Sequence, residues 1–468
     1  MVSKHASAVA ATLAAFGLPL ATAQDSSNTA TVNLAATRGT SPGYAAGFIY
    51  GEPSSIFDQS PNQIPESFYT GMGFIYGRAG GGQDPTGGYI TSLAGYESRF
   101  QGTLQNYQTS RQAGGKFQVL PHDLWGTDHA TKDSYWPGDD GNWTIYDNFL
   151  DRALSDIVAN DMTDGLDWDL WNEPDGGYFW LRSQAQYLAM WNRTYLRIRE
   201  DSAFNNVLIV GPSSASQPST SNSWWTTYIQ YVVSNNVIPE QYTWHDEPGD
   251  PGTDIPNLNT LLAKYNAPSR QININEYATQ SQQNSAGSAW FISRLERYNA
   301  YGLRGNWLSA CQLYDFMAGI VGKTNTSDCT SAQYYPNGQY QVYEWYTKMM
   351  TGTRATTTGT GDGVMDVYTT IGNAGGTVQT LTGVLNQQGT WYITIDNLSA
   401  VGLPESGSLP IQTYGLVDDG PYGEVNAPTN RGIYSHQYSG NSVTFPVYQT
   451  SVDEYTAWVF EFNTTSSS

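Results

Sequence analysis

The sequence is poor in charged residues, above all in positive ones. Lysine and arginine number 21 in 468 residues against 42 aspartates and glutamates, so the formal net charge is −21 at pH 7. Because a protein binds phosphate backbones through positive charge, we expect no nucleic-acid partner. The five histidines do not recur at the spacing of metal ligands, so we expect no metal, and nothing indicates another cofactor. The balance is typical of an acidic secreted protein.

Long apolar runs are missing after residue 20, so no transmembrane helix or membrane partner is expected. The apolar stretch at 6–20 is rich in alanine and too short to span a bilayer, and it follows a weakly basic start at Lys4 and His5. Ala21-Thr22-Ala23 has the small-x-small pattern of a cleavage site. We therefore predict a secretory signal peptide at 1–23 and an extracellular protein.

Cysteine is almost absent, and the two that occur, Cys311 and Cys329, are expected to pair in a secreted chain. Closing this loop would stabilise the fold by roughly 3 kcal/mol. The sequence also predicts a glycosylated surface if the host is eukaryotic. The acceptor sequons lie at Asn142, Asn192, Asn325, Asn397 and Asn463. Nothing in the sequence determines the oligomeric state.

Aromatic and neutral polar residues are abundant instead, with 33 tyrosines and 15 tryptophans. Aromatic faces and uncharged hydrogen-bonding groups suit saccharides, which offer C–H faces and hydroxyls but no charge. The alternative is that the aromatic side chains simply fill a large core. Composition alone does not decide between the two.

Between residues 45 and 352, short apolar strands alternate with helices, which is typical of an α/β protein with a (β/α)8 TIM barrel. We expect strands at 47–51, 73–77, 116–120, 165–173, 207–212, 242–247 and 271–277, and an eighth within 302–315 that contains Trp307. A doubly wound sheet is the alternative, but its usual Gly-rich first turn is absent. The Gly-rich loop at 79–88 lacks the lysine and the strand-to-helix context of a P-loop.

The chain changes character after the barrel. Residues 353–468 alternate in short Thr-, Val- and Gly-rich segments separated by turns, which predicts an appended C-terminal all-β sandwich. Residues 24–44 form an N-terminal segment whose alternating stretch at 31–35 is expected to join that sandwich. Two helices of the barrel are predicted to begin with capping boxes, one at Thr144 with Asp147 and one at Ser183 with Gln186.

Two of the expected barrel strands carry the dipeptide Asn-Glu at their ends. The first strand must stop near Glu173, because Pro174 has no N–H for a strand ladder. Glu276 follows Glu173 by 103 positions, which is close to three βα units of roughly 31 residues each. The two glutamates are therefore predicted at the C-terminal ends of strands four and seven, facing each other across the barrel mouth. Glycosidic bond cleavage needs such a pair of carboxyl groups.

Both segments resemble catalytic motifs of the retaining glycoside hydrolases of clan A. Trp171-Asn172-Glu173-Pro174 matches the acid/base motif, and Asn275-Glu276-Tyr277 is similar to the nucleophile motif. The appended sandwich and the early strand look most like family 39, which includes β-xylosidases and α-L-iduronidases. The resemblance implies that Glu173 is the acid/base and Glu276 the nucleophile. We expect the pKa of Glu173 to be raised by the second carboxylate.

The resemblance also implies substrate-binding residues around this pair. Arg78 matches an arginine that keeps the nucleophile ionised, and Asn172 matches a residue that binds the sugar 2-hydroxyl. His245 lies where the clan often has a residue near the nucleophile. Trp307 matches an aromatic residue that forms the floor of the first sugar subsite, and Tyr277 is expected to contact substrate with the second motif.

Other polar residues at the expected strand ends are weaker candidates. His122 and Asp123, after the third strand, are candidate substrate contacts, although a hydrogen-bonded rim explains them as well. Asp246 and Glu247 are the main rival acids and rank lower, because a Pro-Gly pair follows them and indicates a loop that turns away. The aspartates at 167 and 169 lie inside the fourth strand, where pairing with a barrel-lining arginine or histidine is expected.

The sequence thus predicts a secreted, cofactor-free retaining glycoside hydrolase acting on a plant cell-wall or other polysaccharide or its oligosaccharides. Large loops at 125–141, 177–181 and 311–329 favour a closed pocket and exo action, of the β-xylosidase or α-L-arabinoside- or arabinobiose-releasing type. An endo-acting clan A glycanase and a non-catalytic carbohydrate-binding barrel are the alternatives. The sandwich could itself bind sugar, but a structural role is preferred because no linker separates it from the barrel.

Overall fold

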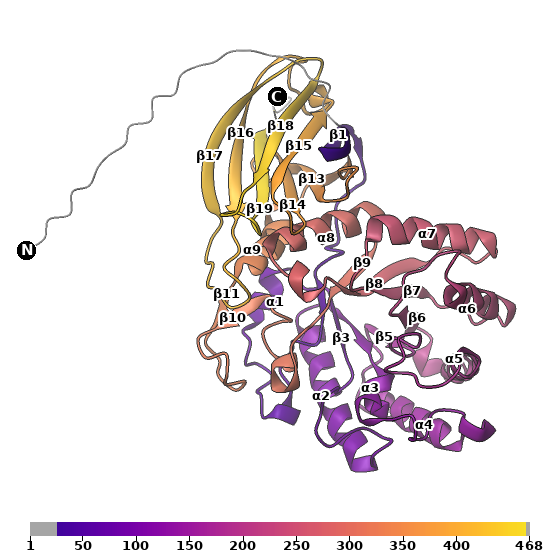
Figure 1. Cartoon of the computed structure of the whole chain (residues 1–468). Helices are drawn as coiled ribbons and strands as arrows, with labels where there is room; N and C mark the ends of the chain where they lie inside the picture. Colours follow the sequence, from indigo (N-terminus) through magenta and orange to yellow (C-terminus); the bar gives the residue numbers. More distant parts are fainter. Residues whose placement is uncertain (1–25, 465–468) are drawn as a thin grey trace, which may run out of the picture.

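The computed structural model describes residues 26–464, so the predicted signal peptide at 1–23 lies outside the described part of the chain. A barrel and a β-domain lie one above the other (Figure 1). In the barrel, eight parallel strands of the described chain close on themselves, β9 pairing with β2. They are β2 (Gly47–Ile49), β3 (Tyr76–Ala79), β4 (Lys116–Val119), β5 (Leu166–Asp169), β6 (Leu208–Ser214), β7 (Gln241–Asp246), β8 (Gln271–Tyr277) and β9 (Tyr301–Arg304). The predicted TIM barrel is confirmed.

Helices surround this barrel, and most begin at a polar cap. They are α1 (Glu66–Gly71), α2 (Leu93–Gln112), α3 (Pro121–Trp125), α4 (Thr144–Ala159), α5 (Gln184–Arg199), α6 (Ser223–Ser234), α7 (Pro251–Lys264), α8 (Ser285–Tyr298) and α9 (Gly338–Glu344). Ser183 caps α5 by accepting the N–H of Gln186, as predicted. The prediction that Thr144 caps α4 is wrong: the Thr144 N–H is already bound by the Asn142 side chain, and Thr144 is the first helical residue.

The β-domain is a nine-stranded sheet within the described residues, and the predicted C-terminal sandwich is confirmed. Its strands are β1 (Thr29–Thr37), β12 (Thr353–Thr358), β13 (Met365–Asn373), β14 (Thr377–Val384), β15 (Gly389–Asp396), β16 (Gly407–Leu416), β17 (Thr429–Tyr438), β18 (Ser442–Gln449) and β19 (Ala457–Asn463). The order is β17-β16-β19-β14-β13-β12-β1-β15-β18. The early strand β1 lies between β12 and β15, so the two ends of the chain build one domain.

Helix α8 joins the two domains, and Figure 1 shows it running beneath the strands of the β-domain. Its residues 285–296 are buried, which is unusual for a barrel helix and follows from apolar contacts on both sides. Arg297 and Arg294 both reach the fully buried Asp366 of β13. Arg354 of β12 donates to Glu296 at 2.9 Å. The interface therefore combines a continuous core with buried ion pairs.

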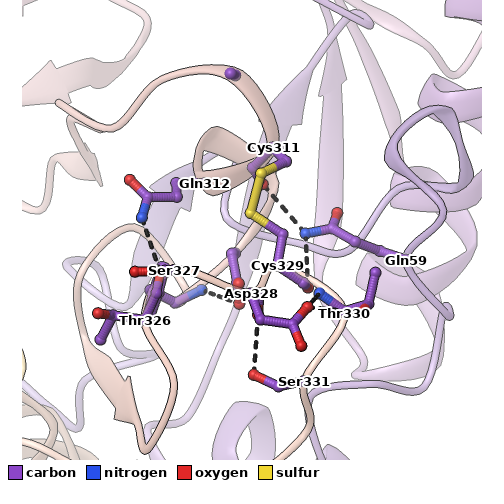
Figure 2. The surroundings of a disulfide bond; sticks show 12 residues. Gln59, Cys311, Gln312, Thr326, Ser327, Asp328, Cys329, Thr330 and Ser331 are labelled. Atoms are coloured by element: carbon purple, nitrogen blue, oxygen red, sulfur yellow. Dashed lines mark hydrogen bonds between the residues drawn. A yellow bond between two sulfur atoms is a disulfide. The ribbon is translucent and has the colours of Figure 1, made fainter.

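The predicted disulfide is present between Cys311 and Cys329. It ties a long excursion after β9 that also contains the small hairpin of β10 (Val321–Lys323) and β11 (Tyr334–Pro336). The Gln59 amide donates to the carbonyl oxygens of both cysteines, at 3.1 and 3.3 Å (Figure 2). This holds the excursion against the loop that follows β2.

Three sequon asparagines, Asn142, Asn325 and Asn463, are exposed, while Asn192 is partly buried on α5. Asn397 is also partly buried, and its amide donates to the Asn33 side chain at 2.8 Å. Glycosylation at any of the five stays a prediction. In residues 26–464 no helix combines the length and apolarity needed to cross a bilayer.

Candidate active site

The parallel strands of the barrel bring the chemically active side chains to one end, because the carboxyl ends of all eight strands open there. Arg78 is contributed by β3, His245 by β7 and Glu276 by β8. Asn172 and Glu173 follow β5 in the next turn. The five come from three strands and from the turn after a fourth, and the closed barrel places them around one point.

Arg78 is the central cation of this cluster and is buried. Its guanidinium donates to Glu276 Oε1 at 2.6 Å, to Asn172 Oδ1 at 2.6 Å and to Asp169 Oδ2 at 2.9 Å. Asp169 also accepts from Asn275 Nδ2 at 2.9 Å, so the aspartate fixes Arg78 from within the barrel. The pairing expected for Asp169 is found, whereas the carboxylate at 167 faces no arginine or histidine among the described residues.

His245 connects the two glutamates. Its Nδ1 lies 2.8 Å from Glu173 Oε1, and its Nε2 lies 3.5 Å from Glu276 Oε1. Burial opposes charge on the ring, but Glu276 and Glu173 outweigh it and raise the pKa of His245. The two carboxylates thus lie on opposite sides of one buried imidazole.

The prediction of a raised pKa for Glu173 is wrong for the free protein. Burial raises the pKa of this carboxyl, but the hydrogen bond and charge of His245, with the charge of Arg78, lower it further, and the net shift is downward. The sequence placed His245 and Arg78 near the pair, but the expected shift counted only the second carboxylate and left out the effect of these two side chains on Glu173.

The backbone around Glu173 also departs from the expected strand end. Strand β5 stops at Asp169, and Glu173 lies in a turn with φ of 42°, in the left-handed region. Its N–H donates to Ser213 O at 2.8 Å, so the neighbouring strand β6 still supports the turn. Non-glycine residues with this backbone conformation are strained, and they are common at functional sites, where the backbone directs a side chain.

A cavity of about 180 Å³ opens at this end of the barrel. Glu173, Glu276, Asn172, His122 and Asp123 all line it, so the structure brings the weaker candidates after β4 into the same site. Burial, and then the charge of Asp128, raises the pKa of Asp123 to about 7. Burial and then Arg78 lower the pKa of His122, which is therefore neutral.

Tyr50 also lines the cavity, and sequence reasoning missed it. Its hydroxyl donates to Asp123 and accepts the N–H of Gly82 at 3.1 Å. It follows β2 directly, so its position at a strand end was the available signal.

Two expected substrate contacts, Tyr277 and Trp307, are not among the residues that line this cavity. Tyr277 is fully buried, with its hydroxyl 2.7 Å from Tyr343 and 3.2 Å from Ala45 O, so its expected contact with substrate is wrong. Successive residues of a strand point to opposite faces, and the neighbour of an inward Glu276 must face the helices. Trp307 lies in the loop after β9 and not inside a strand, yet it is 44% exposed and its indole N–H binds Ala278 O at the mouth.

Solved structures of other proteins share this fold, although the sequence itself has no match among family models or curated proteins. The structure is similar to protein N2152 from Neocallimastix frontalis, with a TM-score of 0.70 at 18% identity, over 93% of this chain and 99% of that one. It is also similar to the GH39 enzyme from Xanthomonas axonopodis pv. citri (TM-score 0.55, 13% identity, 93% and 97% coverage). A GH30 endoxylanase from Clostridium papyrosolvens matches as well (0.54, 13%, 93% and 100%).

The chain shares its fold with these solved structures, and those of families 30 and 39 are clan A glycoside hydrolases. Family 39 is among the similar structures, in agreement with the resemblance noted in the motifs. At these identities the likeness concerns the architecture, including the appended β-domain. A fold of this kind does not fix the chemistry, which depends on the side chains at the mouth of the barrel.

The rival acids that follow His245 have separate environments. Asp246 is fully buried and accepts the Trp244 indole N–H at 2.8 Å, away from the mouth. Glu247 does not turn away as the sequence indicated, because its carboxyl lies against Gly305, directly after β9. Burial, and then the charges of Glu276 and Glu173, raise its pKa to about 9. In the part of the chain that the structure describes, no group of three or more His, Cys, Asp or Glu side chains is arranged to hold a metal ion.

Proposed function

We propose that the chain is a secreted retaining glycoside hydrolase that cleaves glycosidic bonds of polysaccharides or oligosaccharides by double displacement. One observation carries the proposal: Glu173 and Glu276 flank a single imidazole at the barrel mouth, and both line the cavity there. Two carboxyl groups on either side of a scissile bond are the machinery of glycoside hydrolysis.

Glu276 suits the role of nucleophile because a buried guanidinium holds it. The 2.6 Å charge-assisted bond from Arg78 fixes the position of the carboxylate. In the first step Glu276 attacks the anomeric carbon, the bond to the leaving oxygen breaks, and a glycosyl ester forms on Glu276.

Glu173 suits the role of acid/base because it can exchange a proton with His245, whose Nδ1 lies 2.8 Å away. In the free protein the proton shared by Glu173 and His245 lies on His245, because the pKa of Glu173 is lowered and that of His245 is raised. A sugar that expels water from between the carboxylates strengthens their repulsion and raises the proton affinity of Glu173. Protonated Glu173 then donates to the leaving oxygen, and in the second step it takes a proton from the water that hydrolyses the ester.

The surrounding residues suit the binding of a neutral sugar. Asn172 uses its oxygen on Arg78 and keeps its amide hydrogens for a hydroxyl, while the exposed Trp307 ring offers an apolar face. The small cavity and the disulfide-bound loop favour exo action, of the β-xylosidase or α-L-arabinoside- or arabinobiose-releasing type. Endo action, as in the similar endoxylanase, is the second candidate.

The test compares Glu276→Ala and Glu173→Ala with the exposed control Glu200→Ala on a panel of aryl glycosides. We expect both site variants to lose nearly all turnover and the control to keep it. Azide should then give a glycosyl azide of inverted configuration with Glu276→Ala and of retained configuration with Glu173→Ala. Near wild-type turnover of either site variant would refute the pair. Tight sugar binding without turnover of the wild-type protein would favour the non-catalytic alternative.

A further inference from the structure

Glu247 is an acidic side chain beside the catalytic pair for which double displacement has no use. It follows β7 directly and is partly exposed, but its Oε1 atom is buried. Among the described residues this oxygen has no hydrogen-bond partner. A buried polar atom without a partner costs about 1–3 kcal/mol, so its retention calls for an explanation.

Gly305 leaves room for the Glu247 carboxyl. A methyl group at position 305 would lie 1.6 Å from Glu247 Oε1, so the carboxyl can take this position only beside a glycine. The Gly305 N–H donates to Tyr277 O at 2.9 Å, and Tyr277 directly follows Glu276 in β8. The carboxyl is therefore packed against the end of the strand that carries the nucleophile.

The same strand end connects Glu247 to the exposed tryptophan. Ala278 donates its N–H to Asp246 O at 3.3 Å, and its own carbonyl accepts the Trp307 indole N–H at 3.0 Å. Asp246 precedes Glu247, and Trp307 lies two residues after Gly305. Glu247 and Trp307 thus occupy the same side of the mouth.

The charges around Glu247 favour its neutral form. Burial, then Glu276 and Glu173, raise the pKa of Glu247 to about 9; Arg78 opposes this and Asp246 adds to it. At neutral pH the group is consequently a carboxylic acid, able to donate one hydrogen bond and accept others.

We infer that Glu247 is a substrate-binding residue whose carboxyl exchanges hydrogen bonds with one hydroxyl of the saccharide bound beside Trp307. The inference rests on the proposed function. The sugar hydroxyl bonds the solvent-facing part of this partly exposed side chain, while the buried Oε1 stays packed against Gly305.

Four variants test this: Glu247→Gln, Glu247→Ala, Gly305→Ala and the double variant Glu247→Ala/Gly305→Ala. The amide of Glu247→Gln still donates and accepts, so kcat/KM should stay within about threefold of wild type, whereas Glu247→Ala should lose about 10- to 100-fold. Gly305→Ala should resemble Glu247→Ala because its methyl displaces the carboxyl. In the double variant the clash is gone, so the two losses should not add.

Two readouts separate substrate binding from a structural role. Among monodeoxy aryl glycosides, one analogue should be poor for the wild type and no poorer than the parent sugar for Glu247→Ala. The wild-type kcat/KM should fall above about pH 9 as Glu247 ionises, and this limb should be absent from Glu247→Gln. The melting temperature of Glu247→Gln should not fall, since no hydrogen bond is lost.

If the wild type is active, two results would overturn the inference. One is an equal loss of kcat/KM in Glu247→Gln and Glu247→Ala, and the other is additive losses for Glu247→Ala and Gly305→Ala. An inactive wild type would instead overturn the proposed function. The same cycle would then be run on saccharide binding by calorimetry, where additive losses or no change in affinity would again contradict the role of Glu247.

Discussion

Replacing Arg78 with methionine tests the central element of the site. The side chain is fully buried and makes charge-assisted bonds of 2.6–2.9 Å to Glu276, Asn172 and Asp169. Methionine fills similar volume but leaves the buried Asp169 without its cation. Breaking a buried ion pair on one side costs about 3–5 kcal/mol, so we expect the free energy of unfolding to fall by that amount.

The effect on catalysis should be separate from the effect on stability. Glu276 loses the donor that orients it, and loss of one donor preorganised for the reaction typically costs about 10²- to 10³-fold in kcat. Arg78→Lys should be intermediate, because a single ammonium cannot reach three acceptors at once. Turnover of an aryl glycoside and urea denaturation of the same preparations measure the two quantities.

Two further variants test whether the buried Arg78–Asp169 ion pair stabilises the barrel. Adding Asp169→Asn to Arg78→Met should recover about 0.5–3 kcal/mol of stability, because it removes the carboxylate left unpaired. Arg197→Met, which breaks a surface pair with Asp151, should cost at most about 1 kcal/mol. If Arg78→Met unfolds at the wild-type midpoint, or if Asp169→Asn worsens it, the network does not stabilise the barrel as described.

Other predictions concern stability away from the mouth. Burial raises the pKa of Glu52, which is bonded to Ser110, to about 8. The folded state therefore holds this proton more tightly than the unfolded state, and stability should fall by up to about 1.4 kcal/mol per pH unit as pH rises from about 4.5 to 8. Urea denaturation across this range should show the slope, and Glu52→Gln should flatten it; an unchanged slope would contradict the assignment. Asp366→Ala should lower stability by about 3–5 kcal/mol, because two arginines of α8 lose their carboxylate, and an unchanged melting temperature would show that this contact does not fasten the domains.

The barrel and much of the site could be predicted because their signals are local. Apolar strands alternating with amphipathic helices specify βα units whatever the rest of the chain does, and the spacing of Asn172-Glu173 and Asn275-Glu276 converts directly into strand number. Strand ends were harder: β5 stops four residues before Glu173, and Trp307 follows β9 instead of lying in it. Those boundaries depend on which backbone groups find partners on neighbouring strands.

The sequence by itself therefore determined the architecture and the two carboxylates that face the mouth. Only the tertiary structure decided their electrostatics, since His245 lies between Glu173 and Glu276 through contacts spanning residues far apart in the chain. The tertiary structure also directs Tyr277 outward, toward Tyr343, and places the Glu247 carboxyl beside the site, against Gly305. Proton affinity and side-chain direction depend on distances of a few ångströms between strands, and barrel closure sets those distances.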